Sequence, residues 1–201
     1  MRTVREEICR KIDGVLNRLT YANSSMHIIS SINQFSTENG AVPVLSRDVN
    51  FWIVVLDNCG YRVYAELANV YESSSQTAGL KYLLNFCEQN YKQIFLEPQR
   101  APLIIKELKQ KYSETSDLQE RLKAIRDQGL FHLDKHHALD LHEFVRNESL
   151  SYKEKNMLIH VAEEICNTLL ENIKGERKSI ELCLNDDARY ILEDLKKQGD
   201  K

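Results

Sequence analysis

Proline is scarce in this sequence, with three residues (Pro43, Pro98 and Pro102) among 201. All three lie between stretches in which apolar residues recur every three or four positions, where a fixed φ and a missing N–H do least harm to helices. Long helices are therefore permitted almost everywhere else in the chain.

Long uncharged apolar runs are absent, and none approaches the ~20 residues that a membrane-spanning helix needs. The N-terminus, MRTVREEICRKIDGVL, carries charges within its apolar pattern rather than before it. We therefore expect neither a signal peptide nor a transmembrane helix. The five cysteines are odd in number, scattered and never arranged as CxxC, which argues against a disulfide framework or a zinc ribbon and favours a reducing cytoplasm.

A strong net charge is also absent, since the formal value is -3 and the isoelectric point is about 6.1. Whole-domain nucleic-acid binders usually carry a basic footprint, so any nucleic-acid site here must be local. We find no internal repeat and no low-complexity tract. The length suits a single domain over residues 1–201, with residues 176–201 as a short helical appendage.

Helical periodicity covers most of the chain and predicts an all-α fold, an antiparallel helical bundle with additional helices. The segment ELCL near residue 181 could form a short strand, but nothing obvious would pair with it. Ser151 and Glu154 have the spacing of a capping box, and Gly175 is placed to end the helix that they begin. We predict helices over 3–36, from a cap at Ser46 to Val70, over 80–91, from Pro102 to Tyr112, from Ser116 or Asp117 onward, from Ser151 to Gly175, and from Asp186 or Asp187 to Lys196.

Residues 121–144 hold the side chains best suited to chemistry, because they gather two arginines, three aspartates and four of the six histidines. Arg126 and His132 are separated by five residues. On an unbroken α-helix this step turns about 600°, which leaves the two side chains about 120° apart. Gly129 lies between them and is a plausible kink or stop, which would let His132 turn toward Arg126.

An arginine followed by an acidic residue and then by a histidine, late in a helical chain, resembles the motif of HEPN proteins. Arg126, Asp127 and His132 match it in type and order. Over most of its length the chain also resembles the Abi-U branch of bacterial abortive-infection proteins. The resemblance is carried by FW at 51–52, ELANVY at 66–71, LKAIRD and HLD around the motif, LIHVAEEICNTLLENIKG, and DDARYILEDL.

The resemblance implies a metal-independent endoribonuclease that needs no cofactor and acts as a toxin or in abortive infection. Its histidine would move protons, its arginine would steady the phosphate, and the products would carry a 2′,3′-cyclic phosphate and a 5′-hydroxyl. One motif supplies a single such histidine, so we expect a homodimer that brings two copies of residues 126–132 together. RNA would be the substrate, with an antitoxin or regulatory protein as a further partner. Some HEPN toxins are modified on a tyrosine two residues after the histidine, but Asp134 stands there in this sequence.

Two interpretations of these residues compete with the enzymatic one. In the first, Arg126 makes an ordinary ion pair with Glu120 or another carboxylate while His132 caps a helix, and the chain is a non-catalytic interaction or RNA-binding module. Asp127 has two interpretations of its own: it could orient the catalytic groups, or it could be a solvated helix residue.

A metal site is the lesser alternative. His132 and His136 are four residues apart, which places two imidazoles on one helical face, and Asp140 lies nearby. The segment lacks a fixed pattern such as HExxH, so we expect no metal there.

Overall fold

The computed structural model describes residues 3–38, 40–74, 77–130, 149–180 and 187–199. Every regular element within these ranges is helical, so the prediction of an all-α fold is confirmed for the described chain. The helices are α1 (Val4–Ser36), α2 (Ala41–Arg47), α3 (Val49–Val70), α4 (Leu80–Ile94), α5 (Ala101–Ser113), α6 (Ser116–Ala124), the π-helical turn η1 (Ile125–Leu130), α8 (Tyr152–Lys174) and α9 (Asp187–Gly199).

Local sequence signals set the ends of the two longest helices. Thr3 begins α1 with a capping box, in which its side chain accepts from the N–H of Glu6 and the Glu6 carboxylate accepts from the N–H of Thr3. The capping box predicted at Ser151 is present at the start of α8. Gly175 ends α8 with a φ of 75°, a left-handed conformation that glycine adopts without steric cost.

The predicted cap at Ser46 is wrong, because Ser46 lies inside α2 and α3 begins at Val49. Ala41 and Val44 are buried on α2, in one apolar cluster with Leu192 of α9, so this short segment has a core face of its own. Pro43 lies in the first turn of α2, where its missing N–H has no intrahelical partner to lose.

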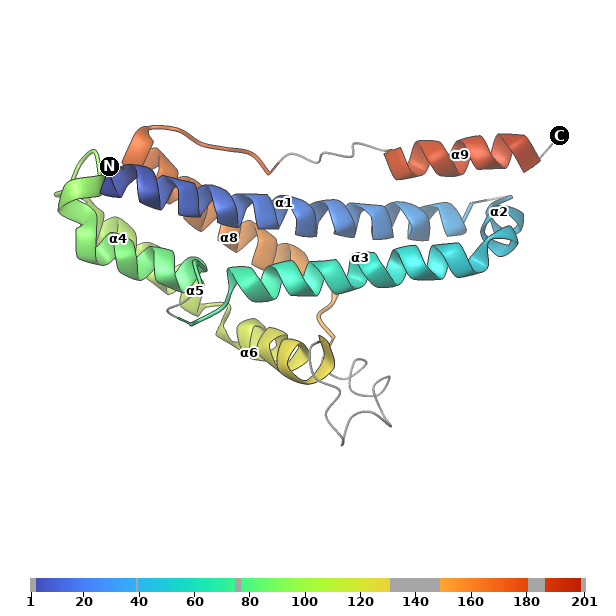
Figure 1. Ribbon diagram of the computed structural model, residues 1–201, viewed down its shortest axis with the longest axis horizontal. Coiled ribbons are helices and arrows are strands. Elements are labelled where there is room, and N and C mark those ends of the chain that lie inside the picture. Colours follow the sequence, from blue (N-terminus) through green and yellow to red (C-terminus); the bar gives the residue numbers. More distant parts are fainter. Residues whose placement is uncertain (1–2, 39, 75–76, 131–148, 181–186, 200–201) are drawn as a thin grey trace.

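The long helices α1 and α3 form an antiparallel hairpin, and α8 runs antiparallel to α1 beside its N-terminal half (Figure 1). Helix α4 also packs against α1, α5 packs against α4 and α8, and α9 lies along the C-terminal half of α1 and against α2. The main core gathers apolar side chains from α1, α3, α4, α5, α6 and α8, and its fully buried members include Ile12, Leu19, Leu67, Leu83, Leu122 and Leu158.

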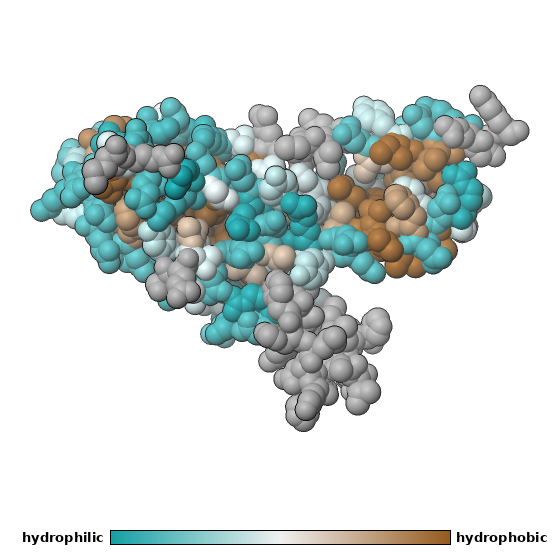
Figure 2. Space-filling view, viewed as in Figure 1, coloured by the Kyte–Doolittle hydropathy of each residue, from teal (hydrophilic) through white to brown (hydrophobic). Residues whose placement is uncertain are grey.

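Apolar residues also gather on the surface over the end of the molecule where α1, α3 and α9 lie (Figure 2). Val49, Phe51, Ile53 and Val54 of α3 are exposed there. This half of α3 is apolar on more sides than its contacts with α1 and α2 cover. Phe51 lies about 30 Å along the helix from the loop that follows α3, so the surface is separate from the site described next. None of the described helices combines the length and the apolarity needed to cross a membrane.

Candidate functional site

Arg126 is carried by the π-helical turn η1, which follows α6 without a break. The helix leaves α geometry at Ile125 and continues as a π-turn through Gly129 to Leu130, whereas the sequence predicted a kink or stop at Gly129. A π-turn closes its hydrogen bonds over five residues rather than four, and such turns occur often at functional sites.

The Arg126 side chain is held by two carboxylates. Its Nε donates to Oδ1 of Asp127 at 2.7 Å, and its Nη1 forms an ion pair with Oε2 of Glu72. A guanidinium has five N–H donors, so these two contacts leave further donors for a phosphate. The Arg126 and Glu72 side chains are 24% and 20% exposed, which makes this pair less screened by solvent than the other Arg126 contact.

Glu72 is fixed in turn by the start of the loop after α3. Its Oε1 accepts from the backbone N–H groups of Ser73 and Ser74, at 2.8 and 3.0 Å. The preceding residue, Tyr71, is buried, and its hydroxyl donates to the carbonyl of Leu158 in α8 at 2.7 Å. The end of the loop packs against its start, because a Cβ on Gly79 would lie 2.9 Å from the carbonyl oxygen of Glu72. The carboxylate that holds Arg126 is therefore anchored to the core.

A cavity of about 200 Å³ opens beside Arg126, between the end of α3 and α6. One stripe of α6 and η1 forms a wall, because residues three or four apart on a helix share a face. Its other wall comes from the end of α3 and the loop. The lining side chains are Ala68, Tyr71, Glu72, Ser73, Ser116, Gln119, Glu120, Leu122, Lys123 and Arg126.

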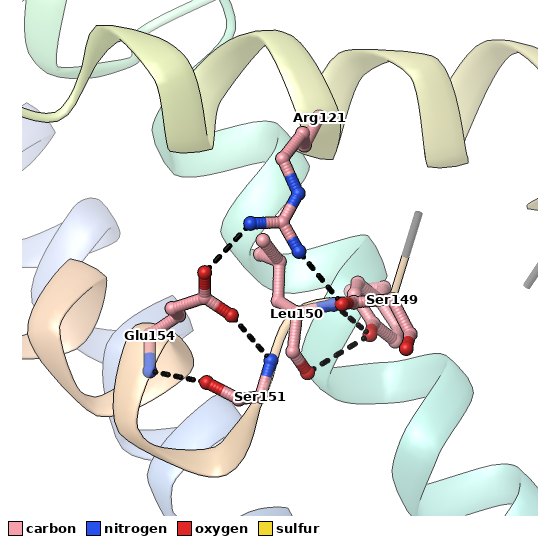
Figure 3. Close-up of polar contacts among 6 residues, drawn as sticks. Arg121, Ser149, Leu150, Ser151 and Glu154 are labelled. Carbon is pink, nitrogen blue, oxygen red and sulfur yellow. Dashed lines mark hydrogen bonds and ion pairs between the residues drawn. The ribbon is translucent and has the colours of Figure 1, made fainter. Parts of the chain in front are cut away.

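Arg121 ties α6 to the start of α8, as Figure 3 shows. Its Nη1 donates to Oε1 of Glu154 at 2.6 Å, and its Nη2 donates to the carbonyl of Ser149 at 2.8 Å. The next residue, Leu150, exchanges hydrogen bonds with the hydroxyl of Tyr64 on α3. Ser149 and Leu150 are thus joined to the same two helices, α3 and α6, that form the cavity.

The Glu154 carboxylate should make the stability of this junction depend on pH. The N–H and side chain of Ser151 and the Arg121 guanidinium favour its charged form and lower its pKa to about 2. A lowered pKa in the folded chain stabilises it above the ordinary carboxyl value, and the contribution is lost as the pH falls toward 2. We expect Glu154→Gln to lower the free energy of unfolding at pH 7, and we expect its difference from the wild-type protein to narrow between about pH 4.5 and 2. Urea unfolding of the wild-type protein and the variant from pH 7 to pH 2 measures this difference. A difference that does not change with pH would contradict the lowered pKa of Glu154.

Of the predicted site residues, the structure brings Arg126 and Asp127 into direct contact. His132, and the metal-site candidates His136 and Asp140, lie outside the described residues, so their distance from Arg126 stays a prediction. Within the described ranges, no three His, Cys, Asp or Glu side chains form a group that could hold a metal ion.

Sequence reasoning missed Glu72, for which no local pattern was available, and Lys123. Lys123 precedes Arg126 by three residues, and that helical spacing was a usable indication that both could face one site. The contacts also bear on the competing interpretations. The Asp127 carboxylate contacts the Arg126 guanidinium but its side chain is 45% exposed, so both interpretations of Asp127 stay open, and the ion pairs of Arg126 also suit a structural arginine.

In the comparison with known protein families, the family model HEPN AbiU2, described as AbiU2, matches residues 5–192. No curated protein and no solved structure matches the chain. The matched residues include α1 apart from Val4, the helices from α2 through α8, and the part of α9 that ends at Leu192.

Proposed function

Since the chain belongs to the AbiU2 family of HEPN proteins, we propose that it is a metal-independent endoribonuclease that cleaves RNA by attack of a 2′-hydroxyl. Membership gives it a HEPN-type role related to abortive infection. The proposal adds the reaction, the substrate and the residues: Arg126 and His132 as the catalytic pair, and Asp127 as the residue that orients the arginine.

The observation that carries the proposal is the setting of Arg126. Arg126 lies on a π-turn that precedes His132 in the chain, and its guanidinium lines a cavity. Two carboxylates hold it there, Asp127 on the same turn and Glu72 in the loop after α3. A planar, permanently charged group held in one place is suited to the oxygens of a phosphodiester. It stabilises charge that develops on those oxygens without having to reorganise during the reaction.

The proposed reaction needs two proton transfers. The 2′-oxygen attacks phosphorus and loses its proton, the bond from phosphorus to the 5′-oxygen breaks, and the 5′-oxygen gains a proton. The products are a 2′,3′-cyclic phosphate and a 5′-hydroxyl. An imidazole with an ordinary pKa near ~6.5 can serve as base or acid at neutral pH.

We propose that a homodimer supplies the second histidine by bringing two 126–132 segments together, in the cytoplasm, with an antitoxin or regulatory protein restraining it.

The second candidate function is a non-catalytic module that binds RNA or a protein. It is favoured by the same ion pairs, because an arginine that serves only to join two parts of the fold would have carboxylate partners of this kind. The two functions differ in whether RNA is cut.

The test is incubation of purified protein with total or transfer RNA in EDTA, beside His132→Ala and His160→Ala. His160 is an exposed histidine on α8 and provides the matched control. We expect cleavage that survives chelation, ends that carry a 2′,3′-cyclic phosphate and a 5′-hydroxyl, and loss of cleavage in His132→Ala alone. Cleavage abolished by EDTA would favour the metal alternative. An uncut RNA under every condition would favour the non-catalytic module.

A further inference from the structure

We propose that the cavity between α3 and α6 is a binding subsite for one nucleotide of the RNA, with the phosphate on Arg126 and Lys123 and the base inside the cavity. The inference rests on the proposed function, and it adds a place for the substrate beside the catalytic pair. A nucleotide has a charged end and a flat apolar end with polar edges, so its subsite needs two kinds of lining.

The charged part of the lining lies at the η1 end of the cavity. Arg126 and Lys123 both line it, and they are one helical turn apart on the same face of the chain. The nearby Glu72 carboxylate is already matched by the Arg126 guanidinium and by the N–H groups of Ser73 and Ser74. Glu120 also lines the cavity, so the lining holds two cations and two carboxylates. A phosphate would therefore bind to Lys123 and to the N–H donors of Arg126 that Glu72 and Asp127 leave free.

The uncharged part of the lining suits a base. Leu122, Ala68 and Tyr71 supply buried apolar surface. Ser116 and Gln119 supply polar groups toward the start of α6, about 10 to 15 Å along the helix from Arg126. The nitrogen of the Gln119 side chain donates to the carbonyl of Tyr112 and to Oγ1 of Thr115, at 2.8 and 2.9 Å. These bonds fix the side chain in the wall and leave its carbonyl oxygen as an acceptor.

The volume limits what the cavity can hold. A cavity of about 200 Å³ is smaller than the roughly 300–1,000 Å³ of pockets that enclose whole small molecules, so it suits one base with the rest of the nucleotide outside. Because the cavity is open to solvent on one side, the RNA chain can continue past it in both directions.

Binding of adenosine 3′-monophosphate tests the subsite without requiring cleavage, with inorganic phosphate as the comparison probe. Titration calorimetry on the full chain should give at least tenfold tighter binding for the nucleotide, because phosphate can use only the two cations. Ser116→Trp, which puts a ring into the cavity, should remove that advantage and leave phosphate binding intact. Lys123→Ala should weaken both probes by about twofold to fivefold, the loss of one exposed charge contact.

Ser113→Trp and Lys106→Ala are the matched controls, since both residues are exposed on α5 and line no cavity wall. Neither should change the affinities. Equal binding of nucleotide and phosphate, or an unaltered advantage in Ser116→Trp, overturns the subsite. Amide shifts induced by the nucleotide in the wild-type chain should map to the cavity even if a variant does not fold. Nucleotide binding by a protein that cuts no RNA keeps the subsite and rejects the ribonuclease, whereas cleavage without nucleotide preference does the reverse.

Discussion

Arg126→Ala is expected to lower the rate of RNA cleavage by about 10³-fold. The phosphorane formed when the 2′-oxygen attacks carries more negative charge than the starting phosphodiester. A guanidinium held at that position stabilises it more than it stabilises the substrate, and only such a difference accelerates the reaction. Arg126→Lys should recover a small part of the loss, because an ammonium keeps the charge but not the planar array of donors.

Single-turnover cleavage of a short fluorescent RNA measures this effect. Arg100→Ala is the matched control, since Arg100 is an exposed arginine at the start of α5 that pairs with Glu97. We expect the control to cleave at the wild-type rate. Folding is checked by thermal unfolding, because Arg126→Ala also leaves the Glu72 carboxylate without its guanidinium. A folded Arg126→Ala protein that cleaves at the wild-type rate would reject Arg126 as a catalytic residue.

Local patterns predicted the parts of this fold that depend on neighbours in the chain. The capping box of Ser151 and Glu154 and the left-handed end at Gly175 involve residues at most a few positions apart, and both are present. Ser46 has the residue type of a cap, yet the burial of Ala41 and Val44 beside Leu192 extends helical structure across it. That burial depends on α9, which lies far away in the sequence.

The residues of the candidate site also differ in whether the local sequence could predict them. Arg126, Asp127 and the irregular turn around Gly129 are close in sequence, so residue types and spacing could indicate them. The partner carboxylate of Arg126 comes from residue 72, in a segment that was predicted only as a loop. No helical spacing relates residues 72 and 126, because the contact exists only after α3 and α6 have packed together. Glu120, the partner suggested by sequence, lines the cavity.

Glu72→Gln should change binding and chemistry in opposite directions. Arg126 lies between two carboxylates, Glu72 and Asp127, so the immediate surroundings carry one net negative charge. Removing the Glu72 charge should strengthen RNA binding and lower KM by about threefold, the size expected for a like charge removed at a solvent-screened distance. The same substitution weakens the contact that holds the guanidinium, since a neutral acceptor binds it about half as strongly. We therefore expect kcat to fall by about tenfold to a hundredfold.

A lower KM together with a lower kcat would show that Glu72 positions Arg126, and would distinguish this role from merely covering the arginine or merely joining the loop to η1. Glu120→Gln is the matched control, because it removes the same charge from the cavity wall while the two carboxylate contacts of Arg126 stay in place. The control should lower KM with kcat unchanged. A rise in kcat for Glu72→Gln would mean that the carboxylate merely covers the arginine and competes with phosphate. Unchanged kcat and KM with a lower melting temperature would mean that Glu72 only joins the loop to η1, and Arg126 would then need no carboxylate from the loop after α3 to act.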